Sequence, residues 1–189
     1  MKKILISLFA FLASINIIAQ EHLSFKGIPI EGSMTEFCQK LKSKGFISIG
    51  KDNNISLFSG DFTGRKATVG VSATDDGKNV FAVVVLLNSE KEWKTLANTY
   101  DYYKDLYTRK YGQPAISKEN NPSVSNSNTS LMIRLNEGVV EYVSTWEVTG
   151  GDIQLSIEKS SEIYEGMVMI RYRDSQNIES KIQNDLNDI

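Results

Sequence analysis

The fold is decided by the stretch VFAVVVLLNSEKEWKTLANTYDYYKDLYTRKYG, residues 80–112, which joins an apolar segment to an amphipathic one. The first part, residues 80–87, contains no polar side chain. A strand of this composition is typically covered on both faces. The sequence therefore predicts a strand over 80–87, and we expect the domain itself or a partner to supply a second layer there.

The second part of this stretch has the periodicity of a helix. Ser89 to Glu92 matches a capping box, and Gly112 and Pro114 supply a stop signal. Between them, large apolar residues recur every three or four positions: Trp93, Leu96, Tyr100, Tyr103, Tyr107 and Tyr111. The spacing predicts a helix over 90–111, with the tyrosines in the core because they share a face with Trp93.

A similar helix is predicted on the N-terminal side of the strand. Ser33 to Glu36 forms another capping box, Gly45 follows as a stop signal, and the pattern between them predicts a helix over 34–44. One helical face bears Met34, Phe37, Cys38 and Leu41. We also expect an edge strand within 22–30, strands over 46–49, 55–62 and 67–74, and a turn at 75–77.

The C-terminal part, after residue 112, contains a polar connection followed by further apolar segments. Residues 113–130 form a long polar connection, which is either mobile or a binding loop. After it we expect strands over 131–135, 140–147, 153–157 and 167–172, and an amphipathic helix over 178–189.

The elements together predict an α+β fold. We expect a largely antiparallel sheet of about seven or eight strands, with two main helices and a C-terminal helix. The order of helix and strands occurs twice, so the segments 33–87 and 89–172 are candidate half-repeats of one unit. A chance succession of common elements would produce the same order.

The N-terminal residues predict export. Two lysines precede a mostly apolar run over 4–18, and Ala19 ends it at the position of a cleavage site. A membrane anchor would need about 20 apolar residues, and this run is shorter and interrupted by Ser7, Ser14 and Asn16. We therefore interpret residues 1–19 as a signal peptide and 20–189 as a single α+β domain in the periplasm or outside the cell.

Net charge and cysteine content exclude several classes of partner and a disulfide-stabilised fold. Removing residues 1–19 takes away two lysines and no acid, which changes the net charge from −2 to −4. This mild negative charge argues against nucleic acid and against anionic lipid as partners. No later segment is long enough to span a membrane. Cys38 is the only cysteine, so no disulfide forms within the chain.

The residue types of common catalytic and metal sites are scarce. His22 is the only histidine and lies near the predicted mature N-terminus, where order is often poor, so we expect no histidine-based enzyme. Cys38 lies on an apolar helix face and is interpreted as a core residue rather than a nucleophile. We expect no metal and no cofactor, because one cysteine and one histidine rarely make a zinc site.

Carboxylates leave one enzyme hypothesis open. A glycan hydrolase needs two carboxylates at a fixed separation, which a sequence does not reveal. The candidates lie in or near predicted strands and turns, where turn formation and solvent-facing positions also explain them. They are Asp52, Asp61, Asp75, Asp76, Glu141, Glu147 and Asp152.

The leading hypothesis is an exported, non-enzymatic module that binds a protein or other macromolecule. Tyr102 points away from the tyrosine stripe and is the aromatic residue we expect to be exposed. The other candidate binding residues lie in the polar connection: Asn120, Asn121, Asn126 and Asn128. The alternatives are the carboxylate-dependent glycan hydrolase and a small-ligand carrier that uses the layer beneath residues 80–87. The sequence leaves a homo-oligomer open.

Short segments resemble known secreted proteins. The signal peptide ends in Ile18-Ala19-Gln20, and the segments 25–30 (FKGIPI), 110–114 (KYGQP) and 170–174 (IRYRD) are similar to those of uncharacterised secreted proteins of Bacteroides-type bacteria. That group implies no activity and no functional residues. The order of helix and strands is similar in outline to β-lactamase-inhibitor-like tandem domains, which bind partner proteins with a curved sheet but have disulfides that this chain lacks.

Overall fold

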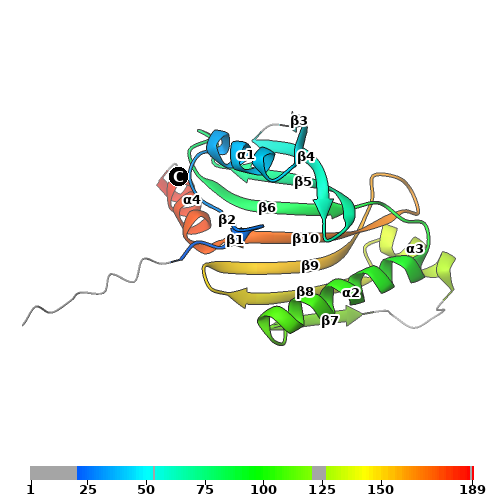
Figure 1. The fold of residues 1–189 in the computed structure, drawn as a ribbon. Coiled ribbons are helices and arrows are strands. Elements are labelled where there is room, and N and C mark those ends of the chain that lie inside the picture. The colour runs from blue at the N-terminus through cyan, green and yellow to red at the C-terminus, as the bar shows by residue number, and fades with distance from the viewer. Residues whose placement is uncertain (1–20, 53, 121–126, 188) are drawn as a thin grey trace, which may run out of the picture.

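The computed structural model describes residues 21–52, 54–120, 127–187 and 189. The predicted signal peptide lies outside the described residues. Within them, four helices, a two-stranded sheet and an eight-stranded sheet form an α+β fold, as predicted. Figure 1 shows the large sheet with helices packed against it.

All neighbouring strands of the large sheet run antiparallel, in the order β3-β4-β5-β6-β10-β9-β8-β7. The strands are β3 (Ile47–Asp52), β4 (Ile55–Phe62), β5 (Arg65–Ala73), β6 (Val80–Leu87), β7 (Ile116–Asn120), β8 (Glu141–Val148), β9 (Gly151–Lys159) and β10 (Gly166–Asp174). A separate N-terminal hairpin consists of β1 (Ser24–Phe25) and β2 (Ile28–Pro29).

The helices are α1 (Met34–Ser43), α2 (Trp93–Tyr111), α3 (Asn128–Asn136) and α4 (Ser175–Asn187). Helix α1 contacts β5, α2 contacts β8, β9 and β10, and α4 follows β10 directly. In the described part of the chain, no helix has both the length and the apolar character needed to cross a membrane.

The strand order is symmetrical about the pair β6 and β10. Each half is a four-stranded meander that follows a helix: α1 precedes β3 to β6, and α2 precedes β7 to β10, with α3 inserted between β7 and β8. The last strands of the two halves pair with each other, with Val85 opposite Ile170. A duplicated unit would produce this arrangement; the duplication itself stays a prediction.

The core lies between the helices and one face of the sheet. In β6, Val83, Val85 and Leu87 are buried on this side, whereas Val84 and Leu86 on the other side are only half-buried. The two-sided cover expected for this strand is therefore incomplete in the described chain. The tyrosine stripe of α2 is buried against the sheet, as predicted, at Tyr100, Tyr103 and Tyr107.

Two expectations for the C-terminal half were wrong. The strand predicted over 131–135 is part of helix α3, because Ser127 caps that helix and Leu131, Met132 and Leu135 have helical spacing and are buried. The connection predicted over 113–130 contains the edge strand β7, which pairs with β8. Tertiary contacts determine the secondary structure of both segments, since an edge strand and a short helix have weak local sequence signals.

The two predicted capping boxes have different outcomes. Ser33 and Glu36 form the box at α1, and the Ser33 backbone lowers the pKa of the Glu36 carboxyl. The box predicted at Ser89 is absent, because the Ser89 hydroxyl donates to Glu165 at 2.7 Å and α2 begins only at Trp93.

Candidate binding site

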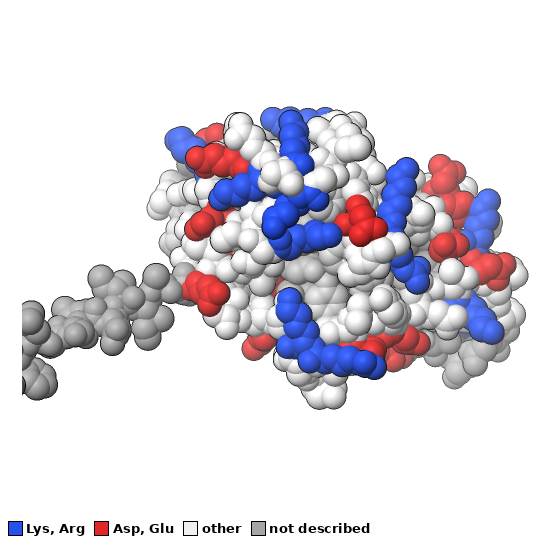
Figure 2. Space-filling view, in the orientation of Figure 1, with Lys and Arg blue, Asp and Glu red and all other residues white. Residues whose placement is uncertain are grey.

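A hollow of about 900 Å³ lies between the N-terminal hairpin and α2. Its third wall is the end of β8 with the following turn, at residues 147–149. Figure 2 shows this face of the molecule, with Lys and Arg side chains on both sides of its hollowed centre. Ligand pockets of proteins commonly have volumes of about 300–1,000 Å³. The hollow is therefore the candidate binding site.

One face of α2 forms the longest wall. The residues that line the hollow are spaced by three or four positions along this helix: Tyr103, Leu106, Tyr107, Lys110 and Tyr111. The indole nitrogen of Trp146 in β8 donates to the carbonyl of Gly112 at 3.0 Å. This bond fixes the C-terminal end of α2 on the sheet and so positions the wall.

The opposite wall is the N-terminal segment, which Asp174 holds in place. The Asp174 carboxylate is fully buried and accepts hydrogen bonds from the backbone of Leu23 at 2.9 Å and from His22 Nδ1 at 3.0 Å. Gly150 lies beneath this segment with φ +84°, and a Cβ there would approach the carbonyl oxygen of Glu21 to 2.3 Å. Only glycine satisfies both the left-handed backbone and the close approach.

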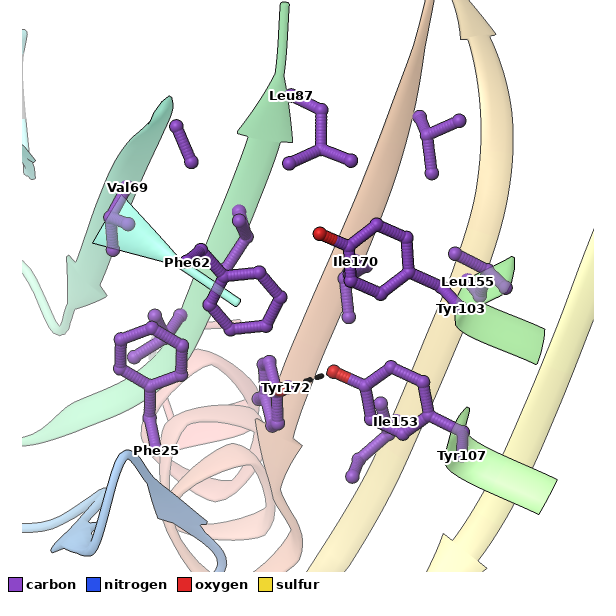
Figure 3. Close-up of a cluster of buried hydrophobic side chains, with 14 of the residues drawn as sticks. Phe25, Phe62, Val69, Leu87, Tyr103, Tyr107, Ile153, Leu155, Ile170 and Tyr172 are labelled. Carbon is purple, nitrogen blue, oxygen red and sulfur yellow. Dashed lines mark hydrogen bonds between the residues drawn. The ribbon is translucent and has the colours of Figure 1, made fainter. Parts of the chain in front are cut away.

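The floor of the hollow is aromatic. Phe62 stacks on Tyr103 with ring centroids 5.9 Å apart, and Phe25 meets Tyr172 edge to face at 5.2 Å. Figure 3 shows Tyr103 and Tyr107 projecting from α2 toward Phe62 and Tyr172. Side chains from three separate elements, β4, α2 and β10, therefore make up the floor, and Phe25 packs beneath it.

The tyrosine hydroxyls of the floor are not all satisfied. Tyr103 bonds with Thr63 Oγ1 at 2.7 Å, and Thr63 in turn donates to the carbonyl of Phe62. Tyr107 and Tyr172 hydrogen-bond to each other, and neither hydroxyl has a further partner among the described residues. One of their two hydrogens therefore lacks an acceptor in the described part of the chain, and a buried group in this state costs about 1–3 kcal/mol unless water or a ligand pairs with it.

Burial keeps these hydroxyls protonated. Removal from water raises the pKa of Tyr107 and of Tyr172 well above the ordinary tyrosine value. The same cause raises the pKa of Tyr103. The floor is therefore neutral at physiological pH.

Charged residues of both signs lie at the rim. Lys26 donates to the carbonyl of Asp61 at 3.0 Å and lies 5.4 Å from the ring centroid of Phe46. Lys110 lies 4.8 Å from the ring centroid of Tyr111. Glu21 contributes negative charge on the hairpin wall. The rim has no large excess of one sign.

His22 is better positioned than its place in the sequence indicated. Its Nδ1 faces Asp174, and its Nε2 lies 3.6 Å from the Glu31 carboxylate. Since both ring nitrogens face carboxylates, no hydroxyl or thiol of the described chain occupies the position of a nucleophile. Sequence reasoning missed Asp174; an Asp at residue 174 with Asn177 three positions later is a helix N-cap signal that could have identified it.

Cys38 is half-buried against the core, in agreement with its predicted place on the apolar face of α1. Burial raises the pKa of its thiol, which disfavours the reactive thiolate. Within the described residues, no three His, Cys, Asp or Glu side chains are grouped so that they could hold a metal ion.

The structure brings two of the candidate hydrolase carboxylates together. Glu147 in β8 lies directly opposite Asp152 in β9. Asp152 forms an ion pair with Arg173 at 2.8 Å, and Glu147 is exposed. The sequence could not show this juxtaposition, because it depends on the register of the hairpin.

Other candidate carboxylates have structural partners. Asp61 accepts a hydrogen bond from the Gly64 backbone within the β4–β5 turn, and Asp75 accepts one from Asn54. Asp76 bonds with Thr74, which lowers the pKa of the carboxyl to about 2. Glu141 pairs with Lys118 at 3.5 Å.

The predicted binding residues do not gather in one place. Tyr102 is exposed, as predicted, and lies on α2 next to Tyr103, with Arg65 5.8 Å from its ring centroid. Asn128 bonds to the first turn of α2: it accepts from the Trp93 backbone and donates to the Lys91 carbonyl at 3.4 Å. Asn120 ends β7, and Asn121 and Asn126 lie outside the described residues.

Comparison of the chain with protein-family models, with curated proteins and with solved structures found no match. The resemblance to secreted Bacteroides-type proteins and to β-lactamase-inhibitor-like domains stays a prediction. The geometry of the hollow is therefore the basis for a functional proposal.

Proposed function

We propose that this chain is an exported, non-enzymatic binding module whose ligand occupies the hollow between the N-terminal hairpin and α2. The observation that supports the proposal is the aromatic floor beneath a space of about 900 Å³, with polar and charged residues around it. Concave sites that combine aromatic surface with hydrogen-bonding groups are typical of ligand binding.

The surroundings of the hollow favour binding over catalysis. Its histidine is held between two carboxylates, and its tyrosine hydroxyls stay protonated. A nucleophile paired with a base would be needed for acyl transfer. The proposal therefore assigns the hollow the task of holding a ligand.

The proposal is tested by identifying what the protein carries when it is isolated from its natural source. Native mass spectrometry, followed by extraction and analysis of the unfolded protein, should detect a bound compound. Leu106→Trp places an indole in the wall of the hollow and should abolish that compound. Leu186→Trp adds the same ring to an exposed position of α4 and should leave it unchanged.

Two results would overturn the assignment. One is the same bound compound in Leu106→Trp as in the wild type, which would place the ligand elsewhere. The other is the absence of any compound from every preparation, in which case the protein does not retain a ligand in the hollow.

A glycan hydrolase is the second candidate, because Glu147 and Asp152 face each other across adjacent strands. Retaining glycosidases hold two carboxyl groups about 5–5.5 Å apart, a separation within reach of a cross-strand pair. Turnover of oligosaccharides that is lost in both Glu147→Gln and Asp152→Asn would favour the hydrolase. Binding without turnover would favour the module.

Export is proposed from the N-terminal residues. Cell fractionation should find the protein in the periplasm or medium, and sequencing of its N-terminus should begin at Gln20. A chain that retains residues 1–19 in the cytoplasm would contradict this.

A further inference from the structure

We propose that the ligand of the hollow is a neutral saccharide, and that the Tyr107–Tyr172 hydroxyl pair donates a hydrogen bond to one of its oxygens. The inference rests on the proposed binding function and names the chemical class of the ligand. Three independent features of the hollow support it: an unused donor, an aromatic surface and a rim with charges of both signs.

The unused donor calls for an oxygen-rich ligand. One of the two hydroxyls, of Tyr107 or Tyr172, donates to the other, and the described residues offer no acceptor for the hydrogen of the second. Both side chains are more than nine-tenths buried, at 7% and 6% exposed, and both line the hollow. Tyr103 differs, because its hydroxyl has the partner Thr63. A ligand hydroxyl, ring oxygen or carbonyl would complete the hydrogen bonding of the pair.

The aromatic surface suits a ligand with one apolar face. Tyr111 is half-buried and stacks on Tyr107 with ring centroids 6.0 Å apart and planes at 15°. Leu106, also half-buried, lines the same wall. A sugar ring has a face of C–H groups that packs on aromatic carbon and an edge of hydroxyls that makes hydrogen bonds. Amphipathic aromatic side chains such as tyrosine match both properties.

The rim disfavours an ionic ligand and a purely apolar one. Lys26, Lys110 and Glu21 all line the hollow, so a charged ligand of either sign would meet repulsion as well as attraction. A fatty acyl chain would cover polar rim groups and leave them without water or a partner, which is costly. A neutral, polyhydroxylated molecule can both donate to the carboxylate and accept from the ammonium groups.

The test is a titration of the protein lacking residues 1–19. Trp146 lies 5.4 Å from Tyr107 between ring centroids, so its fluorescence reports on the hollow. The neutral probes are cello-, xylo-, malto-, manno- and chito-oligosaccharides; the comparison probes are oligogalacturonate and dodecanoate. We expect at least one neutral saccharide to bind more tightly than either comparison probe.

The donor is tested with a double variant, Tyr107→Phe with Tyr172→Phe, which keeps both rings and removes both hydroxyls. We expect the Kd for the saccharide to rise about fivefold, the loss of one neutral hydrogen bond. Tyr100→Phe is the matched control, because its hydroxyl bonds with Ser144 and the residue does not line the hollow. Its Kd should equal that of the wild type. If the double variant does not fold, Tyr172→Phe alone replaces it, with a smaller expected rise.

Each contrary result has a distinct meaning. Tighter binding of oligogalacturonate or dodecanoate than of every neutral saccharide overturns the ligand class and leaves the binding function intact. An unchanged Kd in the folded double variant overturns the role of the hydroxyl pair. Failure of every probe, together with a co-purified compound that is not a saccharide, overturns the class alone. Failure of every probe without any co-purified compound overturns the binding function as well.

Discussion

Asp174 connects three parts of the chain through one buried carboxylate. Its Oδ2 accepts from Leu23 and His22 near the N-terminus, and its Oδ1 accepts from the backbone of Asn177 in the first turn of α4. Asn177 in turn donates to the carbonyls of Ile30 and Val80 at 2.9 Å each. The hairpin wall of the hollow therefore depends on a residue about 150 positions away, at the end of β10.

Replacing Asp174 should be costly. Asp174→Ala leaves buried donors without an acceptor and removes the N-cap of α4, so we expect the free energy of unfolding to fall by about 3 kcal/mol. Urea denaturation measures the change. Asp185→Ala, which breaks an exposed ion pair with Lys181, is the control and should cost less than about 0.5 kcal/mol. Equal effects of the two substitutions would contradict the role of Asp174.

The buried tyrosines should make stability sensitive to alkaline pH. Burial raises the pKa of Tyr100 from 10.0 to about 12. A group whose pKa is higher in the folded than in the unfolded chain stabilises the fold fully below the unfolded value and loses this effect as the pH rises through the folded value. We therefore expect the urea midpoint to fall between pH 10 and pH 12.

Tyr100→Phe should show a smaller decline than the wild type over the same range, because it removes one of the contributing hydroxyls. Absorbance spectroscopy follows the ionisation of the tyrosines in parallel. Ionisation of every tyrosine near pH 10 while the chain stays folded would disprove the protection that burial provides.

At the scale of elements, the start of α2 shows how a tertiary contact replaces a local signal. The sequence predicts Ser89 as the cap. In the structure, the backbone N–H of Trp93, which has no partner within α2, donates to the side chain of Asn128 at the start of α3. We expect Asn128→Ala to lower the free energy of unfolding by about 1 kcal/mol, the usual cost of a lost cap. Thermal unfolding at matched concentrations measures it.

Ser89→Ala tests the alternative cap. Its hydroxyl donates to the Glu165 carboxylate in a solvent-exposed hydrogen bond, so we expect a change below about 0.5 kcal/mol. A larger cost for Ser89→Ala than for Asn128→Ala would show that the local capping box forms after all.

Elements with a complete local signal were predicted closely from the sequence. Strand β6 agrees at both ends, because its run of eight apolar residues is short, rich in valine and followed by a polar segment. Helix α2 agrees at its C-terminus, where Gly112 ends it. Strand β7 was missed because its sequence, Ile-Ser-Lys-Glu-Asn, is mostly polar and because β8, with which it pairs, follows only after a further helix.

The candidate site was predicted less well than the fold. The stripe from Tyr100 to Tyr111 was interpreted as core, and Tyr103 and Tyr107 are indeed buried. Their second role, as the floor of a hollow, depends on Phe62, Tyr172 and the N-terminal segment, which only the fold brings together. Helical periodicity indicates which residues face inward and does not indicate whether the interior is filled.

At the scale of the whole molecule, the two meanders share one sheet and one core. The pair β6 and β10 joins them, and the hydrophobic cluster includes buried residues from both halves, such as Val69 in β5 and Ile153 in β9. The hairpin residue Phe25 also joins the two halves, because it contacts Phe62 of the first and Tyr172 of the second. The symmetrical strand order is therefore compatible with one cooperative unit.

If the chain unfolds as one cooperative unit, a destabilising substitution in the pair β6 and β10 should lower the stability of both halves. Ile170 is fully buried in β10 opposite Val85, and Ile170→Ala should lower the free energy of unfolding by about 3 kcal/mol. Native-state hydrogen exchange should show that the slowest amides of β5 and of β9 lose the same protection, since both exchange only by global opening. Ile182→Ala on the exposed side of α4 should leave both unchanged. Loss of protection in β9 and β10 alone would show instead that the two meanders open as separate units, and that their shared sheet is an association of two domains.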